Sequence, residues 1–223
     1  MYFGDSPGQV GRIRLRFSKG NLPGYLEIRL GNENGQVLGI FRPFYTGDWG
    51  TYKEATFAIN AESIEGYHQV TFRGWDTSGV LGLDWWELAP HANPSDYTLY
   101  EQKEAEAAVS VYRVGVYSNA LGNFGRGDFS VHENIWFGEV GDVSKIKVRF
   151  AKGNNGGRIE VRRDGRYGPV LGSFYPWNTG GWGNYVEHTF GIDDTVSGLH
   201  YLYFVGYDVR GGIWNFDYFE LAA

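Results

Sequence analysis

The sequence predicts an all-β protein built from two β-sandwich modules in tandem. Of 223 residues, 34 are glycine and 17% are aromatic, a composition typical of short strands joined by tight turns. Polar and apolar residues alternate along most segments, which is the pattern of antiparallel strands with one face toward solvent. No amphipathic helical pattern runs for more than about two turns, so we expect little helix.

The tandem arrangement is predicted by an internal repeat. The Thr-Gly-Asp-Trp segment at 46–49 returns as Thr-Gly-Gly-Trp at 179–182, and the strand-like segment 11–21 returns as 144–154. About 80 residues correspond almost without gaps, which is longer than a solenoid repeat and close to domain size. Two copies of one module therefore fill the chain.

The two copies differ in length. Tyr-Phe-Gly at 2–4 already matches Trp-Phe-Gly at 136–138, so the first copy begins in mid-module. We predict a first sandwich at 1–90 that lacks its N-terminal strands, a polar and proline-bearing linker at 91–96, and a complete sandwich at 97–223. A sandwich without its first strands leaves a sheet edge open.

The elements of the second copy follow from its turns. After the linker, 101–110 fits either a short helix or the start of a strand. Glycine-rich turns such as 153–157 separate the alternating segments, and their regular spacing is that of a sandwich. The strands are predicted at 145–150, 158–162, 170–174, 184–190, 199–204 and 214–221.

Composition and charge exclude several classes of partner. The formal charge of −6 and a pI near 5.4 argue against nucleic acid, because phosphate binding requires a basic face. The absence of cysteine rules out disulfides and thiolate metal sites and leaves the compartment open. No apolar run approaches about 18 residues, so we expect no membrane partner.

Trp49 and Trp182 follow glycine-containing turns in polar loops. An indole held on a rigid loop suits stacking against the apolar face of a sugar, with its N–H free for a hydroxyl. The alternative is that each ring folds back over the sheet edge as a lid on the core, since large aromatic residues are mostly buried. Position alone does not separate the two interpretations.

Four features of the second copy occur together in one order. They are the Lys-Glu-Ala-Glu segment at 103–106, the strand at 156–162, the Thr-Gly-Gly-Trp loop at 179–182, and the Asn-Phe-Asp-Tyr-Phe segment at 215–219. In this respect the chain resembles family 6 carbohydrate-binding modules. The resemblance covers 97–223 as a complete module and 2–89 as one without its first strands. It implies a jelly-roll β-sandwich, a glycan site in loops at one edge rather than on the concave sheet face, and a structural Ca²⁺.

The resemblance also implies site residues. Trp182 matches the stacking tryptophan of the family, and Asn215 matches its hydroxyl-binding asparagine. The second wall is normally a tyrosine after an Asn-x-Gly, but here Asn-Phe-Gly is followed by Arg126. The missing ring is expected from Phe124, Phe129 or Tyr117, and Arg126 is an alternative contact for an acidic or sulfated sugar.

The first copy keeps only part of this site. Trp49 holds the tryptophan position, whereas Gly82 stands where the second copy has Asn215, and the early loop is absent. We therefore expect a degraded site. Trp75, which matches Tyr207, is expected to be either a further exposed ring or a cross-strand packing partner.

For Ca²⁺, the family's ligands match Glu104, Glu106 and Asp217. Hard oxygen ligands from the first and last strands would clamp the ends of the module together. The alternative is that the two glutamates are solvated charges on one face of a strand. The first copy retains Asp84 without a preceding Glu-x-Glu, so we expect no such clamp there.

The leading hypothesis is non-catalytic binding of an oligo- or polysaccharide by a module pair that directs a larger, secreted glycan-active protein to its substrate. Two weak sites on a short linker would raise apparent affinity if both reach the polysaccharide. A glycoside hydrolase is a weaker alternative, because the acidic residues that stand out by position are already expected to bind Ca²⁺. A structural or adhesive protein that self-associates through exposed rings is the third alternative.

Overall fold

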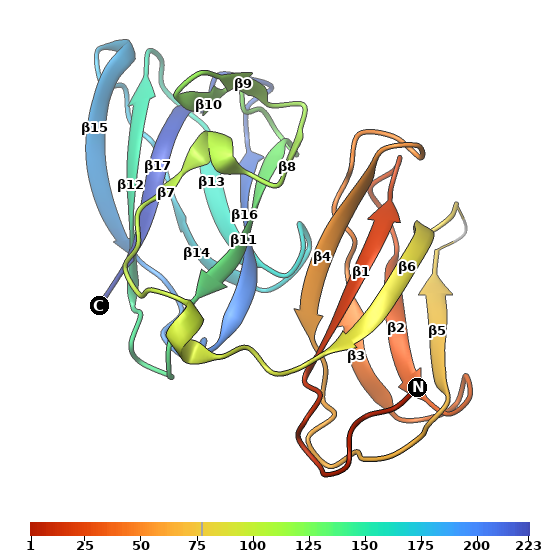
Figure 1. Cartoon of the computed structure of the whole chain (residues 1–223). Helices are drawn as coiled ribbons and strands as arrows, with labels where there is room; N and C mark the ends of the chain where they lie inside the picture. Colours follow the sequence, from red (N-terminus) through yellow and green to blue (C-terminus); the bar gives the residue numbers. More distant parts are fainter. Residues whose placement is uncertain (77) are drawn as a thin grey trace. The chain divides into compact units, whose positions relative to one another are not determined.

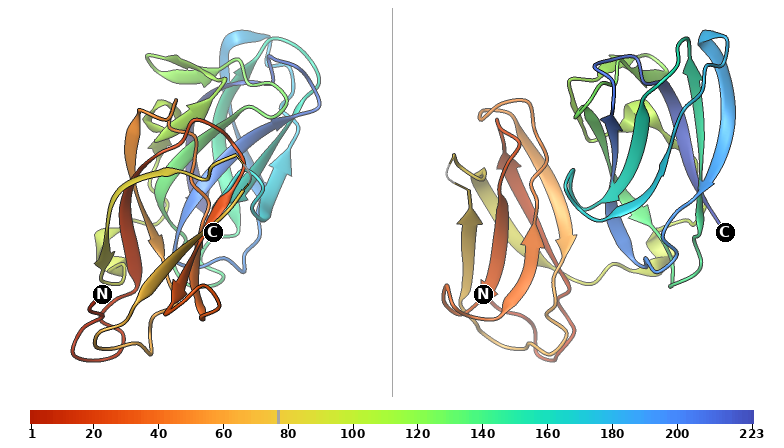
Figure 2. Two further views of the ribbon diagram at one scale, coloured as in Figure 1. Left: turned by 90° about the vertical axis from the view of Figure 1, so that its right-hand side faces the viewer. Right: turned by 180° about the vertical axis from the view of Figure 1, so that it is seen from behind.

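The computed structural model describes residues 1–76 and 78–223, and it divides the chain into two compact units, Met1–Asp96 and Tyr97–Ala223. Both units consist of antiparallel strands, which confirms the all-β prediction. In the described part of the chain, helix is limited to two short 3-10 turns, η1 (Pro94–Asp96) and η2 (Ala105–Ala107). Figures 1 and 2 show each unit as two facing layers of strands.

The second unit is a sandwich of a six-stranded and a five-stranded sheet. The larger sheet has the order β15-β12-β17-β10-β9, and β7 pairs with β17. The smaller sheet has the order β14-β13-β16-β11-β8. The larger sheet contains β7 (Lys103–Glu104), β9 (Gly115–Tyr117), β10 (Ala120–Gly122), β12 (Lys145–Lys152), β15 (Gly181–Gly191) and β17 (Asn215–Ala222). The smaller contains β8 (Ser110–Tyr112), β11 (Phe129–Trp136), β13 (Arg158–Arg163), β14 (Val170–Phe174) and β16 (Leu199–Tyr207).

The core of the second unit lies between these sheets. Alternate residues of each strand point inward, as in β12, where Ile146, Val148 and Phe150 are fully buried between solvent-facing cations. Trp214 and Phe216 stack with ring centroids 4.2 Å apart at the centre of an aromatic cluster. This alternation is the reason the predicted strands match β12 to β17 so closely.

The first unit contains two three-stranded sheets with the orders β4-β1-β6 and β3-β2-β5. They correspond to β12 to β17 of the second unit, and no described strand of residues 1–96 corresponds to β7 to β11. Tyr2, which matches Trp136 of β11, pairs with Tyr67 in an isolated bridge. The strands are β1 (Arg12–Ser18), β2 (Tyr25–Leu30), β3 (Val37–Phe41), β4 (Tyr52–Ala58), β5 (Val70–Trp75) and β6 (Gly82–Ala89).

The shorter first unit buries its aromatic residues less completely. Leu83 is 40% exposed, whereas Phe216 at the matching position is fully buried. Phe72 and Trp86 are likewise only half-buried, although their ring centroids lie 4.6 Å apart in an edge contact. The reason is that β5 and β6 are edge strands here, while their counterparts β16 and β17 are covered on both sides.

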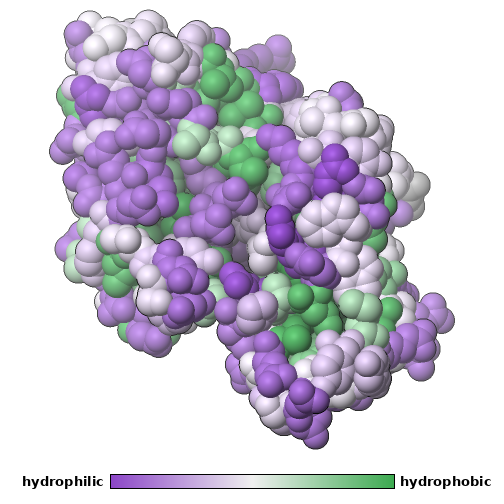
Figure 3. All heavy atoms as spheres, viewed as in Figure 1, coloured by the Kyte–Doolittle hydropathy of each residue, from purple (hydrophilic) through white to green (hydrophobic). Residues whose placement is uncertain are grey.

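The surface carries both polar and apolar residues. Figure 3 shows apolar residues among polar ones on the viewed face of each unit. Among the described residues, no helix has the length and apolar character needed to cross a bilayer.

Candidate functional site

The Thr-Gly-Gly-Trp loop of the second unit is tied to the end of β12. The backbone N–H of Lys152 donates to Thr179 Oγ1 at 2.9 Å, and the backbone N–H of Thr179 donates to the Lys152 carbonyl at 2.9 Å. Gly180 and Gly181 adopt φ values of +93° and +156°, and the first of these lies in the left-handed region that favours glycine. The threonine thus anchors the loop, and the glycines allow the turn that presents Trp182.

Trp182 rests on two glycines of neighbouring loops. A Cβ added at Gly153 would lie 2.6 Å from the indole Nε1, and one at Gly212 would lie 3.1 Å from the far edge of the ring. The residue nevertheless keeps 39% of its surface exposed. The indole is therefore a platform on the surface rather than a lid over the core.

Beneath this platform a buried lysine holds the loops together. Lys152 is fully buried, and its Nζ donates to the carbonyls of Gly156 and Ile213, the latter at 2.5 Å. Burial lowers the pKa of Lys152 to about 8, because desolvation penalises the charged ammonium. The two carbonyls belong to the loops that carry Gly153 and Gly212, so the lysine fixes the floor on which Trp182 lies.

Asn215 lies between Trp182 and a second aromatic residue. Its Nδ2 donates to the Trp182 carbonyl at 2.8 Å. A Cβ added at Gly122 would lie 2.5 Å from Asn215 Oδ1 and 2.9 Å from Cε2 of Tyr117, so both side chains border the same glycine. The structure thus brings Trp182, Asn215 and Tyr117 to one end of the six-stranded sheet.

The prediction of Phe124 as the second aromatic wall is wrong. Phe124 is fully buried in edge contact with Trp214, at 5.8 Å between ring centroids. Phe129 is also buried, stacked on Tyr112. A ring that faces the core has no surface to offer a ligand.

Of the three rings expected as the second wall, Tyr117 is the exposed one. It is 49% exposed, and its hydroxyl accepts a hydrogen bond from Asn123 Nδ2 at 2.8 Å. Tyr117 lies opposite Ala120 in the short β9–β10 hairpin, and its ring reaches back to Gly122.

Arg126 lies on the loop next to this site, with an exposed side chain. Its backbone N–H donates to the Val209 carbonyl at 2.6 Å, and the Gly125 N–H donates to Asp128 Oδ2 at 2.9 Å. Asp128 in turn lies 3.0 Å from Arg113 Nε. The loop is therefore held by its backbone and by Asp128, and the Arg126 guanidinium takes no part in these bonds.

The first unit repeats the platform. Trp49 is 45% exposed, and Cβ atoms added at Gly20 and Gly79 would lie 2.5 Å and 3.4 Å from its ring. Lys19 is fully buried and donates from Nζ to the carbonyls of Pro23 at 2.6 Å and Val80 at 2.5 Å. Burial lowers its pKa to about 8 as well.

The tryptophan carbonyl has a different side-chain donor in the first unit, which the sequence did not predict. In the first unit Ser18 Oγ donates to the Trp49 carbonyl at 2.8 Å, the same bond that Asn215 makes to Trp182. Ser18 pairs with Gly82 across the sheet, where the second unit pairs Ala151 with Asn215. The backbone bond is conserved, but the side-chain amide is replaced by a hydroxyl that is fully buried.

Trp75 does not join this site. It lies opposite Tyr25 in the β2–β5 pairing, with the two rings stacked at 6.1 Å, and Arg73 lies over its other side at 4.3 Å. Trp75 is 40% exposed, so it is a cross-strand partner on the sheet surface rather than in the core.

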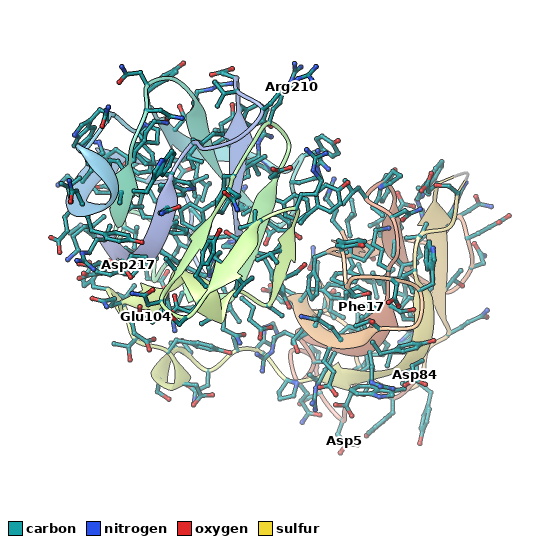
Figure 4. The ribbon with its side chains drawn as sticks, turned by 90° about the horizontal axis from the view of Figure 1, so that it is seen from above. Asp5, Phe17, Asp84, Glu104, Arg210 and Asp217 are labelled. Atoms are coloured by element: carbon teal, nitrogen blue, oxygen red, sulfur yellow. The ribbon has the colours of Figure 1, made fainter. Side chains whose placement is uncertain are left out.

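The three expected Ca²⁺ ligands lie where β7, η2 and β17 meet. Glu104 pairs in register with Tyr218, and Figure 4 shows Glu104 and Asp217 in the same part of the second unit. Glu106 Oε2 is buried and has no hydrogen-bond partner among the residues that the structure describes, whereas Asp217 is ion-paired with Arg149. In residues 1–76 and 78–223, no three acidic or histidine side chains are already gathered as a metal-binding group.

An unpartnered buried carboxylate oxygen is costly unless a cation or proton satisfies it. Glu106 therefore fits a cation site, while Asp217 has Arg149 as its present counter-ion.

A family model described as carbohydrate binding module (family 6) matches residues 7–90 and 99–223. Among curated proteins, the chain is 27% identical over 186 residues to an endo-1,4-beta-xylanase A of Thermoclostridium stercorarium, covering 77% of this chain and 35% of the relative. The chain thus spans about a third of the length of the curated relatives it matches.

Solved structures of single modules are similar to the chain. One is a family 6 carbohydrate-binding module from Clostridium cellulolyticum in complex with xylose, with 26% identity and a TM-score of 0.52 over 56% of this chain and 98% of that chain. Another is a β-1,3-glucan-binding module of the same family from Bacillus halodurans, with 29% identity and a TM-score of 0.50 over 56% of this chain and 96% of that chain.

Proposed function

Because the chain belongs to the family 6 carbohydrate-binding modules, whose function is non-catalytic carbohydrate binding, we propose that its second unit binds a β-linked polysaccharide between Tyr117 and Trp182. The observation that carries this proposal is the pair of exposed rings on either side of Asn215. Aromatic faces stack on the C–H faces of pyranose rings, and the amide between them supplies hydrogen bonds to hydroxyls. The family assignment does not favour a self-associating adhesive protein.

Xylan is the glycan we propose first. The curated relative is a xylanase, and one similar module is described in complex with xylose. A β-1,3-glucan is the second choice, since another similar module binds it. Both chains present sugar faces without axial substituents, which suits stacking on a flat ring.

Calorimetric titration with xylotetraose, cellotetraose and laminaritetraose tests this site. We expect Trp182→Ala and Tyr117→Ala each to weaken binding by at least about tenfold, since an aromatic contact contributes roughly 1–3 kcal/mol. Tyr67→Ala is the control, because Tyr67 is 83% exposed but lies in the first unit beside Tyr2. Undiminished affinity in both site variants would refute the proposed site.

We also propose that Glu104, Glu106 and Asp217 hold a structural Ca²⁺. The support is the chemistry of three hard carboxylates, from β7, η2 and β17, and the unsatisfied oxygen of Glu106. When bound, the ion would supply positive charge to these carboxylates and link β7 to β17. Arg149 would then give up its contact with Asp217.

The Ca²⁺ proposal predicts a melting temperature of the second unit that rises with CaCl₂ and falls with chelator, as expected for an ion that binds only the folded state. Glu106→Gln should remove this dependence. Glu133→Gln, at an exposed position on β11, should retain it. Identical melting in Ca²⁺ and chelator would disprove the proposal.

The context of the chain is a further proposal. Since it spans about a third of its xylanase relatives, we propose that it serves a secreted glycan-active enzyme as a targeting region and has no hydrolytic activity of its own. Incubation of the purified chain with xylan and β-glucan should release no reducing sugar. Release abolished by one carboxylate substitution would contradict this.

A further inference from the structure

Two arginines lie on adjoining loops beside the proposed glycan site. Arg126 follows Gly125, and a Cβ added at Gly125 would lie 2.3 Å from the carbonyl oxygen of Arg210. The Arg126 N–H bonds the Val209 carbonyl, and the Ile213 N–H bonds the Phe124 carbonyl at 3.0 Å. These bonds align the loops 124–126 and 209–213 side by side.

The second of these loops also touches the stacking ring. Gly212, two residues beyond Arg210, lies against the indole edge of Trp182. Figure 4 shows Arg210 extending outward from the second unit. Arg210 therefore lies on the loop that supports the platform, and Arg126 lies on the loop beside it.

Both guanidinium groups are exposed and form no ion pair within the described residues. The carboxylates on the same loops have other partners, because Asp128 pairs with Arg113 at 3.0 Å and Asp208 lies 3.6 Å from Arg158. Two like charges on adjacent loops repel each other unless an anion binds. The arrangement leaves positive charge available next to a sugar-stacking ring.

We propose that the second unit selects acidic glycans, with Arg126 and Arg210 binding the carboxylate of a uronic acid attached to the stacked chain. This inference rests on the proposed glycan site at Trp182 and Tyr117. A guanidinium donates paired N–H groups in a geometry that matches a carboxylate. A sulfate ester has related chemistry and is a separate arm of the test.

The first unit offers an internal comparison. Its loop at 76–80 contains no arginine, and the early loop that carries Arg126 is absent from it. A preference for acidic sugars should therefore belong to the second unit alone. Binding of a sugar at the Trp49 platform should not depend on the charge of that sugar.

The test is calorimetry of the full chain at low salt with three probes. They are xylotetraose bearing one glucuronic acid branch, the same oligosaccharide with its carboxyl group reduced to the alcohol, and a sulfated xylotetraose. We expect the acidic form to bind about tenfold more tightly than the reduced form, as a charge-assisted hydrogen bond would give. Added salt should reduce the ratio of the affinities for the acidic and the reduced probe.

Arg126→Gln and Arg210→Gln should each reduce the preference for the acidic probe and leave affinity for the reduced probe within about twofold of wild type. Lys145→Gln is the control, because it removes one charge from the opposite end of β12, where Lys145 bonds the Ala223 carbonyl. Circular dichroism melts verify that the variants fold.

Equal affinity for the acidic and reduced probes would overturn the inference while leaving the glycan site intact. A preference for the acidic probe that persists in the double arginine variant would also overturn it. Tighter binding of the sulfated probe alone would mean that the arginines bind a sulfate ester rather than a carboxylate. Failure of all three probes to bind would instead refute the proposed glycan site itself.

Discussion

At the scale of single residues, the two units keep the same hydrogen bond with different side chains. Asn215 donates to the Trp182 carbonyl, whereas Ser18 donates to the Trp49 carbonyl from the neighbouring strand. The backbone behind the indole is thus fixed in both units. Only the second retains an amide whose oxygen, with no donor among the described residues, is open to a hydroxyl.

This exchange predicts that mutations can separate the support of the Trp182 loop from the recognition of the glycan. Asn215→Gly should weaken glycan binding and also lower stability by about 1 kcal/mol, because the Trp182 carbonyl loses its donor. Adding Ala151→Ser, which recreates the pair found in the first unit, should restore stability but not affinity. Thermal melts and calorimetry on the two variants check this, and recovered affinity in the double variant would show that Asn215 acts only as a support.

His132 predicts acid sensitivity of the second unit. It is buried among Phe204, Phe216 and Phe219, and burial lowers its pKa to about 3. Between pH 6.5 and 3 the unfolded chain binds this proton and the folded unit does not, so stability falls as pH falls through that window. The slope from this residue is about 1.4 kcal/mol per pH unit.

Urea unfolding at pH 6.5 and 4.5 measures this effect. The His132→Gln variant keeps a hydrogen-bonding group near Ser130 Oγ. We expect its free energy of unfolding to fall by roughly 2 kcal/mol less than that of the wild type between the two pH values. Equal losses would mean that carboxylates account for the acid sensitivity.

At the scale of elements, a buried lysine at the end of a central strand supports each tryptophan loop. Lys152→Met should leave the carbonyls of Gly156 and Ile213 unpaired, destabilise the second unit by roughly 2 kcal/mol and weaken glycan binding through a displaced Trp182. Lys19→Met is the matched variant, and it should destabilise only the first unit without affecting binding to the second. Calorimetry and melting curves on both variants decide between a local and a general effect.

The strands of the second unit from residue 145 onward could be predicted because alternation and glycine-bearing turns determine local structure there. Trp182 was identified from the repeated Thr-Gly-x-Trp loop, whereas Asn215, which the first copy replaces by Gly82, was identified only from the resemblance to the family. The sequence could not decide between Phe124, Phe129 and Tyr117 for the second wall, because which ring is buried depends on packing between the sheets rather than on spacing. The buried lysines and the Ser18 bond depend on contacts between distant segments, which no local pattern reports.

At the scale of the whole chain, two platforms joined by a short linker predict avidity. Trp49→Ala should leave the affinity for a short oligosaccharide at the second unit unchanged but lower apparent affinity for polymeric xylan by about tenfold, since linked sites raise effective concentration. Affinity gels with soluble xylan and calorimetry with xylotetraose measure the two quantities. Unchanged retention on the polymer would mean that the first unit contributes no binding.

The burial of the two platform lysines also determines how this protein can be attached to a surface. Amine-reactive reagents need an accessible, uncharged amine, and Lys19 and Lys152 are fully buried and hydrogen-bonded. Coupling to a resin or sensor chip would therefore proceed through the remaining lysines, of which Lys145 lies at the end of β12 opposite the tryptophan loop. A chain immobilised through Lys145 should keep the glycan-binding loops of the second unit free for polysaccharide.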